Sequence, residues 1–146
     1  MMSYFPEGFL INNKENKLYL SSFDNFMRAH FDKTPLEQRV SFCDCDHNLH
    51  IDFGFIHGII PREECAIGIS DGTTRDIAII ARVNKPVRFI IEEIKETPKG
   101  KIAILSRKKV QTDFIENRLS GFSTGDIIDA KVTHLENFGA FVDIGC

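Results

Sequence analysis

GDIIDAKVTHLENFGAFVDIGC, residues 125–146, shows most clearly which fold the chain adopts. Two β-strands are legible in it, and the second contains the run Phe-Gly-Ala-Phe at residues 138–141. Alternating apolar and polar residues are typical of half-buried strands. Two strands alone do not enclose a core, so the question is whether the preceding sequence holds a finished copy of the same unit.

An earlier segment, residues 35–54, repeats the pattern of residues 127–145 with one extra residue in its loop. The positions of charged residues, the alternation of apolar residues and the closing glycines, Gly54 and Gly145, agree. Such internal similarity is typical of a repeated structural unit. The chain is therefore predicted to hold one complete β-unit and the first two strands of a second.

Around these segments the sequence alternates between helical and strand patterns. Residues 21–34 carry phenylalanines at helical spacing, with Phe23, Phe26 and Phe31 on one expected apolar stripe, and residues 106–122 also predict a helix. Short strands are expected between them, including a hairpin in 66–80 that turns at Asp71-Gly72. Many short strands separated by turn signals indicate a small barrel or sandwich.

The composition is that of a globular protein: 146 residues, of which 42% are hydrophobic and 27% charged. No apolar run approaches the roughly 20 residues that a membrane span needs. The first residues, MMSYFPEGFL, lack the pattern of a secretory signal. We therefore expect a cytoplasmic protein with no membrane partner.

The net charge of −3 alone argues against a strongly basic nucleic-acid-binding protein. Residues 82–118, however, hold ten lysines and arginines against five aspartates and glutamates. A cluster of lysine and arginine residues is one sign of a nucleic-acid interface. A charged stretch is more often a solvated face, so charge does not decide the function.

Cys43, Cys45 and His47 alternate along the chain and would share one face of a strand, as zinc ligands could. They lack a second pair at a recognised spacing. We therefore expect free thiols here and at Cys65 and Cys146, with no metal and no cofactor.

The chain shows no phosphate-binding loop, no nucleophile elbow and no zinc-protease motif. Asp44, Asp46 and His47 lie close together, but such residues are ordinary in a polar turn. We therefore expect no enzymatic activity.

Residues 125–145 resemble the opening of the RNA-binding domain named after bacterial ribosomal protein S-one. That signature has a Gly-Asp start, a Phe-Gly-Ala-Phe-Val run and a closing glycine, all present here. Residues 58–64 and 101–109 resemble, more loosely, the third and last strands of the same domain. The chain thus resembles the N-terminal part of an S-one-like ribosomal protein.

The resemblance implies a mainly β fold: a five-stranded oligonucleotide-binding (OB) barrel with flanking helices, followed by the first two strands of a second such domain. The expected domains are listed in chain order: an N-terminal helical extension at 1–34, an S-one-type domain at 35–107, a linker helix at 108–124 and an incomplete second domain at 125–146.

The resemblance also implies RNA-binding residues. Phe138 and Phe141 fall on the stacking positions of the family, and a bulge at Gly139 would bring both rings to one side. His47 and His50 occupy these places in the complete copy, where histidine offers less stacking surface. Four basic residues are expected to contact RNA phosphates: Arg88, Lys101, Arg107 and Lys131.

The leading hypothesis is an RNA-binding protein of the translation apparatus that binds single-stranded RNA, such as mRNA, on the small ribosomal subunit. One alternative is a protein-interaction module that docks on the ribosome and has weak or no RNA affinity. Another is the accessory RNA-binding part of a ribonuclease.

Overall fold

The computed structural model describes residues 6–128 and 130–144 of the chain. Gly145 and Cys146, named above, lie outside these residues. The described helices are α1 (Lys14–Tyr19), α2 (Phe23–Asp32), α3 (Ile77–Ile80) and α4 (Lys108–Asn117), with short 3-10 turns η1 (Arg62–Glu64) and η2 (Leu119–Gly121). The strands are β1 (Leu36–Arg39), β2 (Phe42–Cys43), β3 (Leu49–Asp52), β4 (His57–Ile60), β5 (Pro86–Thr97), β6 (Gly100–Ser106), β7 (Lys131–Glu136) and β8 (Gly139–Asp143).

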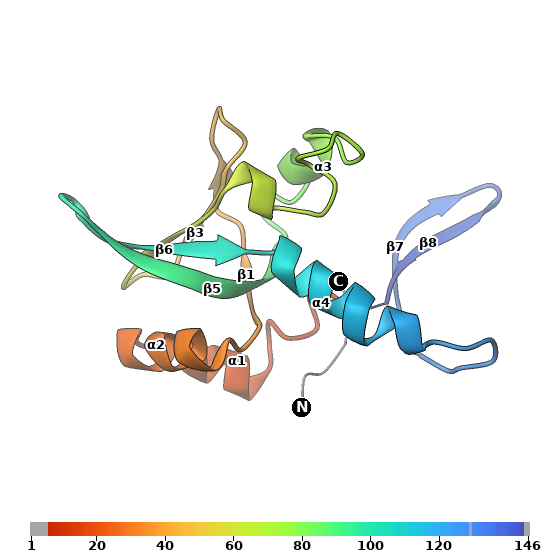
Figure 1. Cartoon of the computed structure of the whole chain (residues 1–146), viewed down its shortest axis with the longest axis horizontal. Coiled ribbons are helices and arrows are strands. Elements are labelled where there is room, and N and C mark those ends of the chain that lie inside the picture. Colours follow the sequence, from red (N-terminus) through yellow and green to blue (C-terminus); the bar gives the residue numbers. More distant parts are fainter. Residues whose placement is uncertain (1–5, 129, 145–146) are drawn as a thin grey trace.

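Six strands form one curled sheet in the order β1-β5-β6-β4-β3-β2 (Figure 1). All neighbours are antiparallel except β4 and β6, which are parallel. The two end strands, β1 and β2, are consecutive parts of one segment. That segment forms hydrogen bonds with both ends of the sheet. The Val40 amide donates to the Lys85 carbonyl beside β5, and the Ser41 amide donates to the His50 carbonyl on β3. The expected five strands are thus six because the first is broken in two, and the fold is mainly β and OB-like.

The core lies inside the curled sheet. Leu49, Ile51, Phe89 and Leu105 are fully buried there. Gly58 allows β4 to approach this core, since a Cβ at that position would lie 2.6 Å from a ring carbon of Phe53. A side chain at Gly58 would therefore displace core packing.

Helix α2 covers one side of the sheet (Figure 1). Phe26 is fully buried, with its ring 5.0 Å from that of Phe53. Ser22 caps the helix by accepting from the Asn25 amide. The predicted apolar stripe is wrong at Phe31, which is 77% exposed.

The expected hairpin in 66–80 is wrong, because the segment forms turns and the short helix α3. The Asp71 carboxylate accepts from the amide and hydroxyl of Thr73, and the Thr74 amide donates to the Gly68 carbonyl. These local bonds stabilise a loop instead of a cross-strand ladder.

Strands β7 and β8 form a separate two-stranded sheet that projects away from the main sheet beyond α4 (Figure 1). Every residue of β7 is exposed. A hydrogen bond joins this hairpin to the rest of the chain, from the Glu7 amide to the Asp143 carboxylate at 2.8 Å. In the described part of the chain, no helix is both long and apolar enough to cross a membrane.

Candidate nucleic-acid interface

Three aromatic side chains on neighbouring strands form a row on the outer face of the sheet, called here the aromatic row: Phe42 on β2, His50 on β3 and His57 on β4. Phe42 and His50 are cross-strand partners, and their rings stack in parallel with centroids 4.3 Å apart. The His57 ring lies 5.0 Å from that of His50, and Nδ1 of His50 lies 2.7 Å from Nε2 of His57. Phe42 is 48% exposed, so its ring offers a stacking surface to a ligand.

The turn between β2 and β3 holds His50 in place through Asp44. The Asp44 carboxylate accepts from the Asp46 and Asn48 amides and lies 2.7 Å from Nε2 of His50. The bond to His50, followed by that to the Asn48 amide, holds the pKa of Asp44 well below its usual range. Asp44 is therefore ionised at neutral pH and fixes the orientation of the His50 ring.

His57 has a lowered pKa, chiefly because burial disfavours its charged form and secondly because of the neighbouring His50. A histidine with a lowered pKa is neutral at neutral pH. His57 is thus suited to stacking more than to attracting phosphate at neutral pH.

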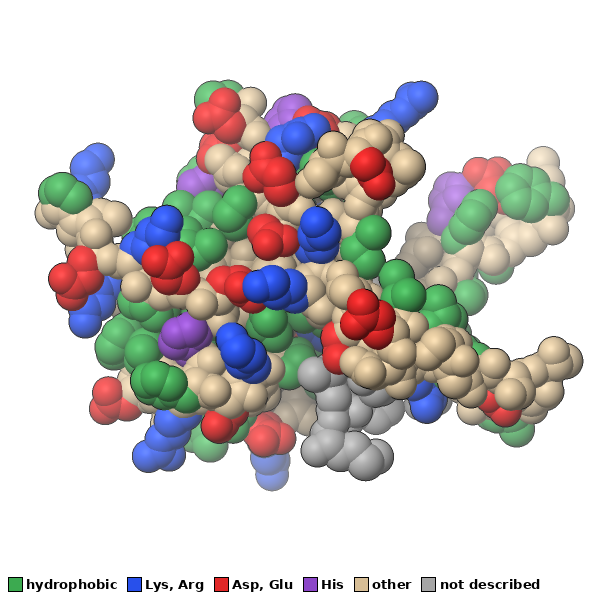
Figure 2. Space-filling view, viewed as in Figure 1, with side chains coloured by type: hydrophobic (Ala, Val, Ile, Leu, Met, Phe, Trp, Pro, Cys, Tyr) green, Lys and Arg blue, Asp and Glu red, His purple; other side chains and the backbone are tan. Residues whose placement is uncertain are grey.

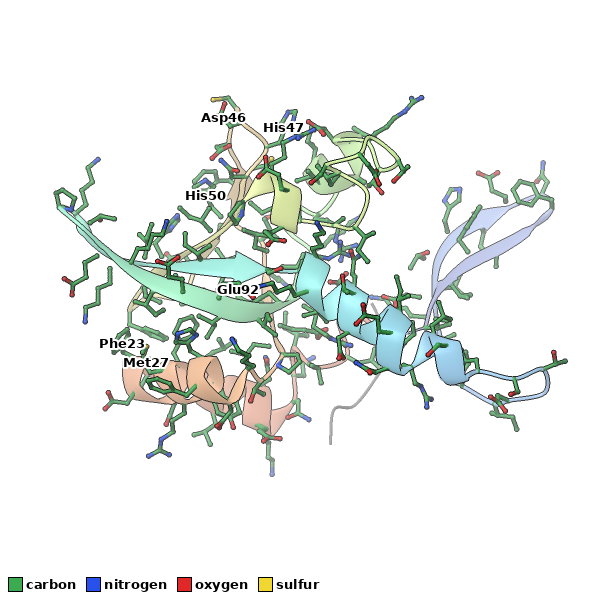
Figure 3. All side chains as sticks on the ribbon, viewed as in Figure 1. Phe23, Met27, Asp46, His47, His50 and Glu92 are labelled. Atoms are coloured by element: carbon green, nitrogen blue, oxygen red, sulfur yellow. The ribbon has the colours of Figure 1, made fainter. Side chains whose placement is uncertain are left out.

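His47 does not lie in the aromatic row. It occupies the left-handed region at φ 66°, and its ring Nδ1 lies 2.5 Å from the Asp76 carboxylate. Arg62 binds the same carboxylate through two nitrogens, at 3.0 and 2.7 Å. Hydrogen bonds from Arg62 first, and then from His47, lower the pKa of Asp76 to about 2. Figure 3 shows His47 at the tip of the β2–β3 turn and His50 farther along the strand.

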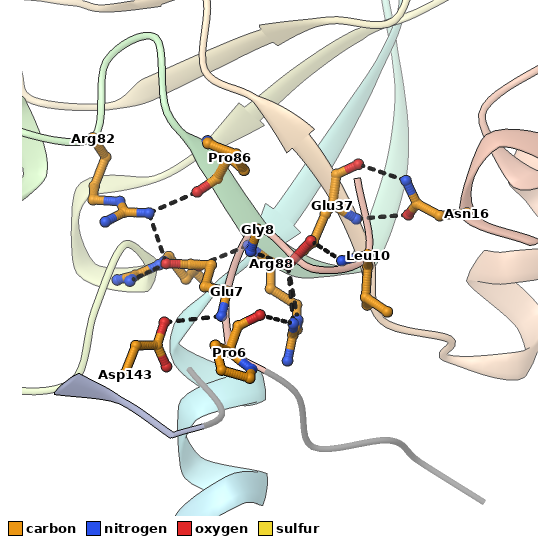
Figure 4. A network of polar contacts seen from close by, with 11 residues as sticks. Pro6, Glu7, Gly8, Leu10, Asn16, Glu37, Arg82, Pro86, Arg88 and Asp143 are labelled. Atoms are coloured by element: carbon orange, nitrogen blue, oxygen red, sulfur yellow. Dashed lines mark hydrogen bonds and ion pairs between the residues drawn. The ribbon is translucent and has the colours of Figure 1, made fainter. Parts of the chain in front are cut away.

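Arg88 is buried, with 2% of its surface exposed, and is therefore not placed to meet an RNA phosphate. Its guanidinium donates to the Glu37 carboxylate at 3.1 and 3.0 Å (Figure 4). Residues 6–10, called here the strap, cross this site, and the Gly8 and Leu10 amides donate to the same carboxylate. Arg88 thus has a structural role in place of the expected phosphate contact.

Arg107 also turns inward, and its side chain is 11% exposed. It donates to both carboxylate oxygens of Glu7, at 2.9 and 2.8 Å, and to the Cys65 carbonyl. Arg82 donates to the same Glu7 carboxylate at 2.8 Å. The phosphate contact expected at Arg107 is replaced by a contact with the strap.

Lys101 lies on β6 beside the tip of the β5–β6 hairpin. Its ammonium is 5.0 Å from the Phe23 ring centroid and 3.8 Å from the Glu96 carboxylate. Its side chain is 50% exposed. Lys95 and Lys99 are exposed on the same hairpin, so three ammonium groups lie at this end of the sheet.

Phe138 and Phe141 are 83% and 52% exposed, and their rings pack edge to face at 6.2 Å. Phe138 lies in the two-residue turn between β7 and β8, where strand alternation does not apply. The irregularity in pairing falls between Val132 and His134, not at Gly139 as expected. Lys131 begins β7 next to the strap, where its ammonium would lie 3.2 Å from a Cβ at Gly8.

Charges are mixed over the surface. Figure 2 shows acidic and basic side chains interspersed on the visible face, without a continuous basic area. Cys43, Cys45 and Cys65 are free thiols. Within residues 6–128 and 130–144, no three acidic, cysteine or histidine side chains are placed to hold a metal ion.

The sequence did not predict Phe42 and His57 as residues of the site. Val40 is buried and Phe42 is exposed, although residues two apart on a continuous strand share a face. The break between β1 and β2 shifts the alternation by one residue. Gly58 and Ile60 are buried in β4, so strand alternation places His57 on the outer face. The same alternation, read from the sequence, could have predicted the position of His57.

A curled sheet of this topology is typical of the oligonucleotide-binding class of fold. No family model matches the chain. It is 43% identical over 65 residues to small ribosomal subunit protein bS1 of Staphylococcus epidermidis, 40% identical over 63 residues to that of Staphylococcus aureus, and 44% identical over 65 residues to that of Staphylococcus saprophyticus. Each match covers 40% of this chain and 16% of the relative's length. The similarity supports an S-one-like domain protein, and the chain matches only a small part of these relatives.

Proposed function

We propose that the chain binds single-stranded RNA on the aromatic row and acts in translation on the small ribosomal subunit. The observation that carries the proposal is the stacked Phe42–His50 pair, extended by His57, on the outer face of an OB-like sheet. In this fold the equivalent strand face and the adjoining loops bind oligonucleotides. The relatives named bS1 support a place on the small subunit.

Phosphate contacts are proposed at the tip of the β5–β6 hairpin. Lys95, Lys99 and Lys101 are exposed there, whereas Arg88 binds Glu37 on β1 and Arg107 binds Glu7 in the strap. Loops next to the binding face of OB folds commonly contact the nucleic acid. The RNA bases would thus stack on the aromatic row, and the phosphate backbone would cross the tip of the β5–β6 hairpin.

Replacing Phe42 by alanine is expected to weaken RNA binding by about 5- to 150-fold, because loss of one stacked base costs about 1–3 kcal/mol. Fluorescence anisotropy with labelled single-stranded RNA at low salt measures the change. Phe31→Ala is the matched control, since Phe31 is an exposed phenylalanine on α2. Equal affinities of the two variants would contradict a role for the aromatic row.

Replacing Lys95, Lys99 and Lys101 together by alanine is expected to reduce the dependence of affinity on salt. Each phosphate contact contributes about 0.7 to the slope of log affinity against log salt for single strands. Loss of three contacts would therefore flatten the slope by roughly 2. The same titration over several salt concentrations gives the slope, and an unchanged slope would remove the hairpin tip from the interface.

A ribosome-docking module with little RNA affinity is the second candidate. It is favoured by the inward orientation of Arg88 and Arg107, which reduces the basic charge available for RNA. This candidate predicts no RNA binding even at low salt by the wild-type chain.

A further inference from the structure

The outer face of the main sheet continues beyond the aromatic row onto β6. In that strand Ala103 and Leu105 are fully buried. Successive side chains of a strand point to opposite faces, so Ile102 and Ile104 point outwards, where both are partly exposed. Two isoleucines therefore lie on the same face of the sheet as the aromatic row.

The strand register places the outward-facing side chains in two rows that cross the sheet from β2 or β3 to β5, because paired residues share a face. The first row consists of Phe42, His50, Ile59, Ile104 and Glu93. The second row consists of Asp52, His57, Ile102 and Lys95. On β5 the first row thus ends at an exposed carboxylate and the second at an exposed ammonium group.

The aromatic row passes from the first of these rows to the second. Phe42 and His50 belong to the first row and His57 to the second, and the His50 and His57 rings lie 5.0 Å apart. Beyond His57 the second row continues through Ile102 to Lys95.

This diagonal course leaves both carboxylates to its sides. Asp52 begins the second row before His57, and Glu93 ends the first row beyond Ile104. Both carboxylates are exposed and would repel a phosphate. A nucleic-acid strand that follows the diagonal instead ends beside Lys95, whose charge attracts its phosphates.

We propose that single-stranded RNA crosses the outer face along this diagonal, with its bases on the aromatic row, one further base over Ile102 and a phosphate at Lys95. This inference rests on the proposed function and adds the course of the strand and a contact at Ile102. An isoleucine side chain offers apolar surface and no hydrogen-bonding group. The contact is therefore with the face of a base and does not read its sequence.

A matched pair of variants tests the course. Ile102→Phe places a ring on the diagonal, whereas Ile104→Phe places the same ring on the same face of the same strand, two residues away. Ile102→Phe is expected to strengthen RNA binding by about fivefold or more, because a base can stack on the added ring. Ile104→Phe is expected to stay within about twofold of wild type. Fluorescence anisotropy with labelled single-stranded RNA at low salt measures both affinities.

A second measurement uses the wild-type chain and needs no variant. Isoleucine methyl groups are labelled with ¹³C, and unlabelled oligouridine is added while the methyl signals are followed by NMR. The Ile102 signal is expected to shift more than the Ile104 signal. Ile127 is 98% exposed and precedes the β7–β8 hairpin, so its signal is the control and is expected to stay unchanged.

Two results would overturn the diagonal course and leave RNA binding in place: equal effects of Ile102→Phe and Ile104→Phe, or a larger methyl shift at Ile104 than at Ile102. Absence of any RNA binding by the wild-type chain at low salt would overturn the proposed function and this inference together. The two kinds of failure are therefore distinguishable.

Discussion

Replacing Glu37 by alanine is expected to lower the free energy of unfolding by about 3–5 kcal/mol, because it leaves the buried charge of Arg88 unpaired. Glu37 is fully buried, and the Arg88 side chain is 3% exposed. The variant also removes the acceptor of the Gly8 and Leu10 amides. Urea unfolding followed by circular dichroism measures the loss.

The control for this variant is Glu96→Ala. Glu96 also faces a basic residue, Lys101, but at 3.8 Å and with a carboxylate side chain that is 79% exposed. Exposed ion pairs contribute about 0–1 kcal/mol. A Glu37→Ala loss no larger than that of Glu96→Ala would show that the buried pair does not stabilise the fold.

A double variant separates loss of the pair from loss of packing. Glu37→Leu with Arg88→Met replaces both charges by apolar side chains of similar length. Buried pairs replaced in this way are often neutral in stability, so the double variant is expected to be more stable than Glu37→Ala. Stability no higher than that of Glu37→Ala would show that the unpaired Arg88 charge does not account for the loss, and would point instead to the missing acceptor of the Gly8 and Leu10 amides.

The sequence predicted those parts of the sheet in which a single segment carries a strand pattern of its own. The repeat at residues 35–54 predicted strands, and this segment forms β1, β2 and β3 with Ile51 buried. Residues 58–64 and 101–109, expected to contain the third and last strands, overlap β4 and β6. Residues 66–80 were not predicted correctly, because Asp71-Gly72 forms a local turn in a loop as readily as in a hairpin.

The candidate site was predicted only in part. His50 lies on the outer face as expected, but its partners come from β2 and β4 and depend on strand register. Register is set by the whole sheet and not by any one strand. The RNA-binding roles of His47, His50, Lys101, Lys131, Phe138 and Phe141 stay predictions.

Arg88 and Arg107 show why a count of charged residues is a poor guide to the charge that a surface offers to RNA. Arg88 and Arg107 contributed to the basic character of residues 82–118, yet their carboxylate partners are Glu37 and Glu7. The donor and acceptor are 100 residues apart for Arg107 and Glu7. No local pattern in the sequence reports a pair at that separation.

The strap is also expected to make stability depend on pH. Burial alone would raise the pKa of Glu7, but Arg107 first, and then Arg82 and the Arg88 amide, lower it to about 2. A carboxyl with a lowered pKa in the folded state stabilises the protein above its unfolded pKa of about 4.5. That contribution, about 3 kcal/mol, is lost as the pH falls from about 4.5 through 2.

Glu7→Gln isolates this contribution from other acidic groups. At neutral pH the variant is expected to be less stable than wild type by about 3 kcal/mol, since glutamine cannot carry the charge that pairs with Arg82 and Arg107. The difference should shrink towards zero between pH 4.5 and 2, because wild-type Glu7 becomes protonated there. Asp44 and Asp76 also have lowered pKa values, but they are the same in both proteins. Urea unfolding at a series of pH values gives the difference directly, and a difference that stays constant from pH 7 to pH 2 would show that the Glu7 charge does not hold the strap.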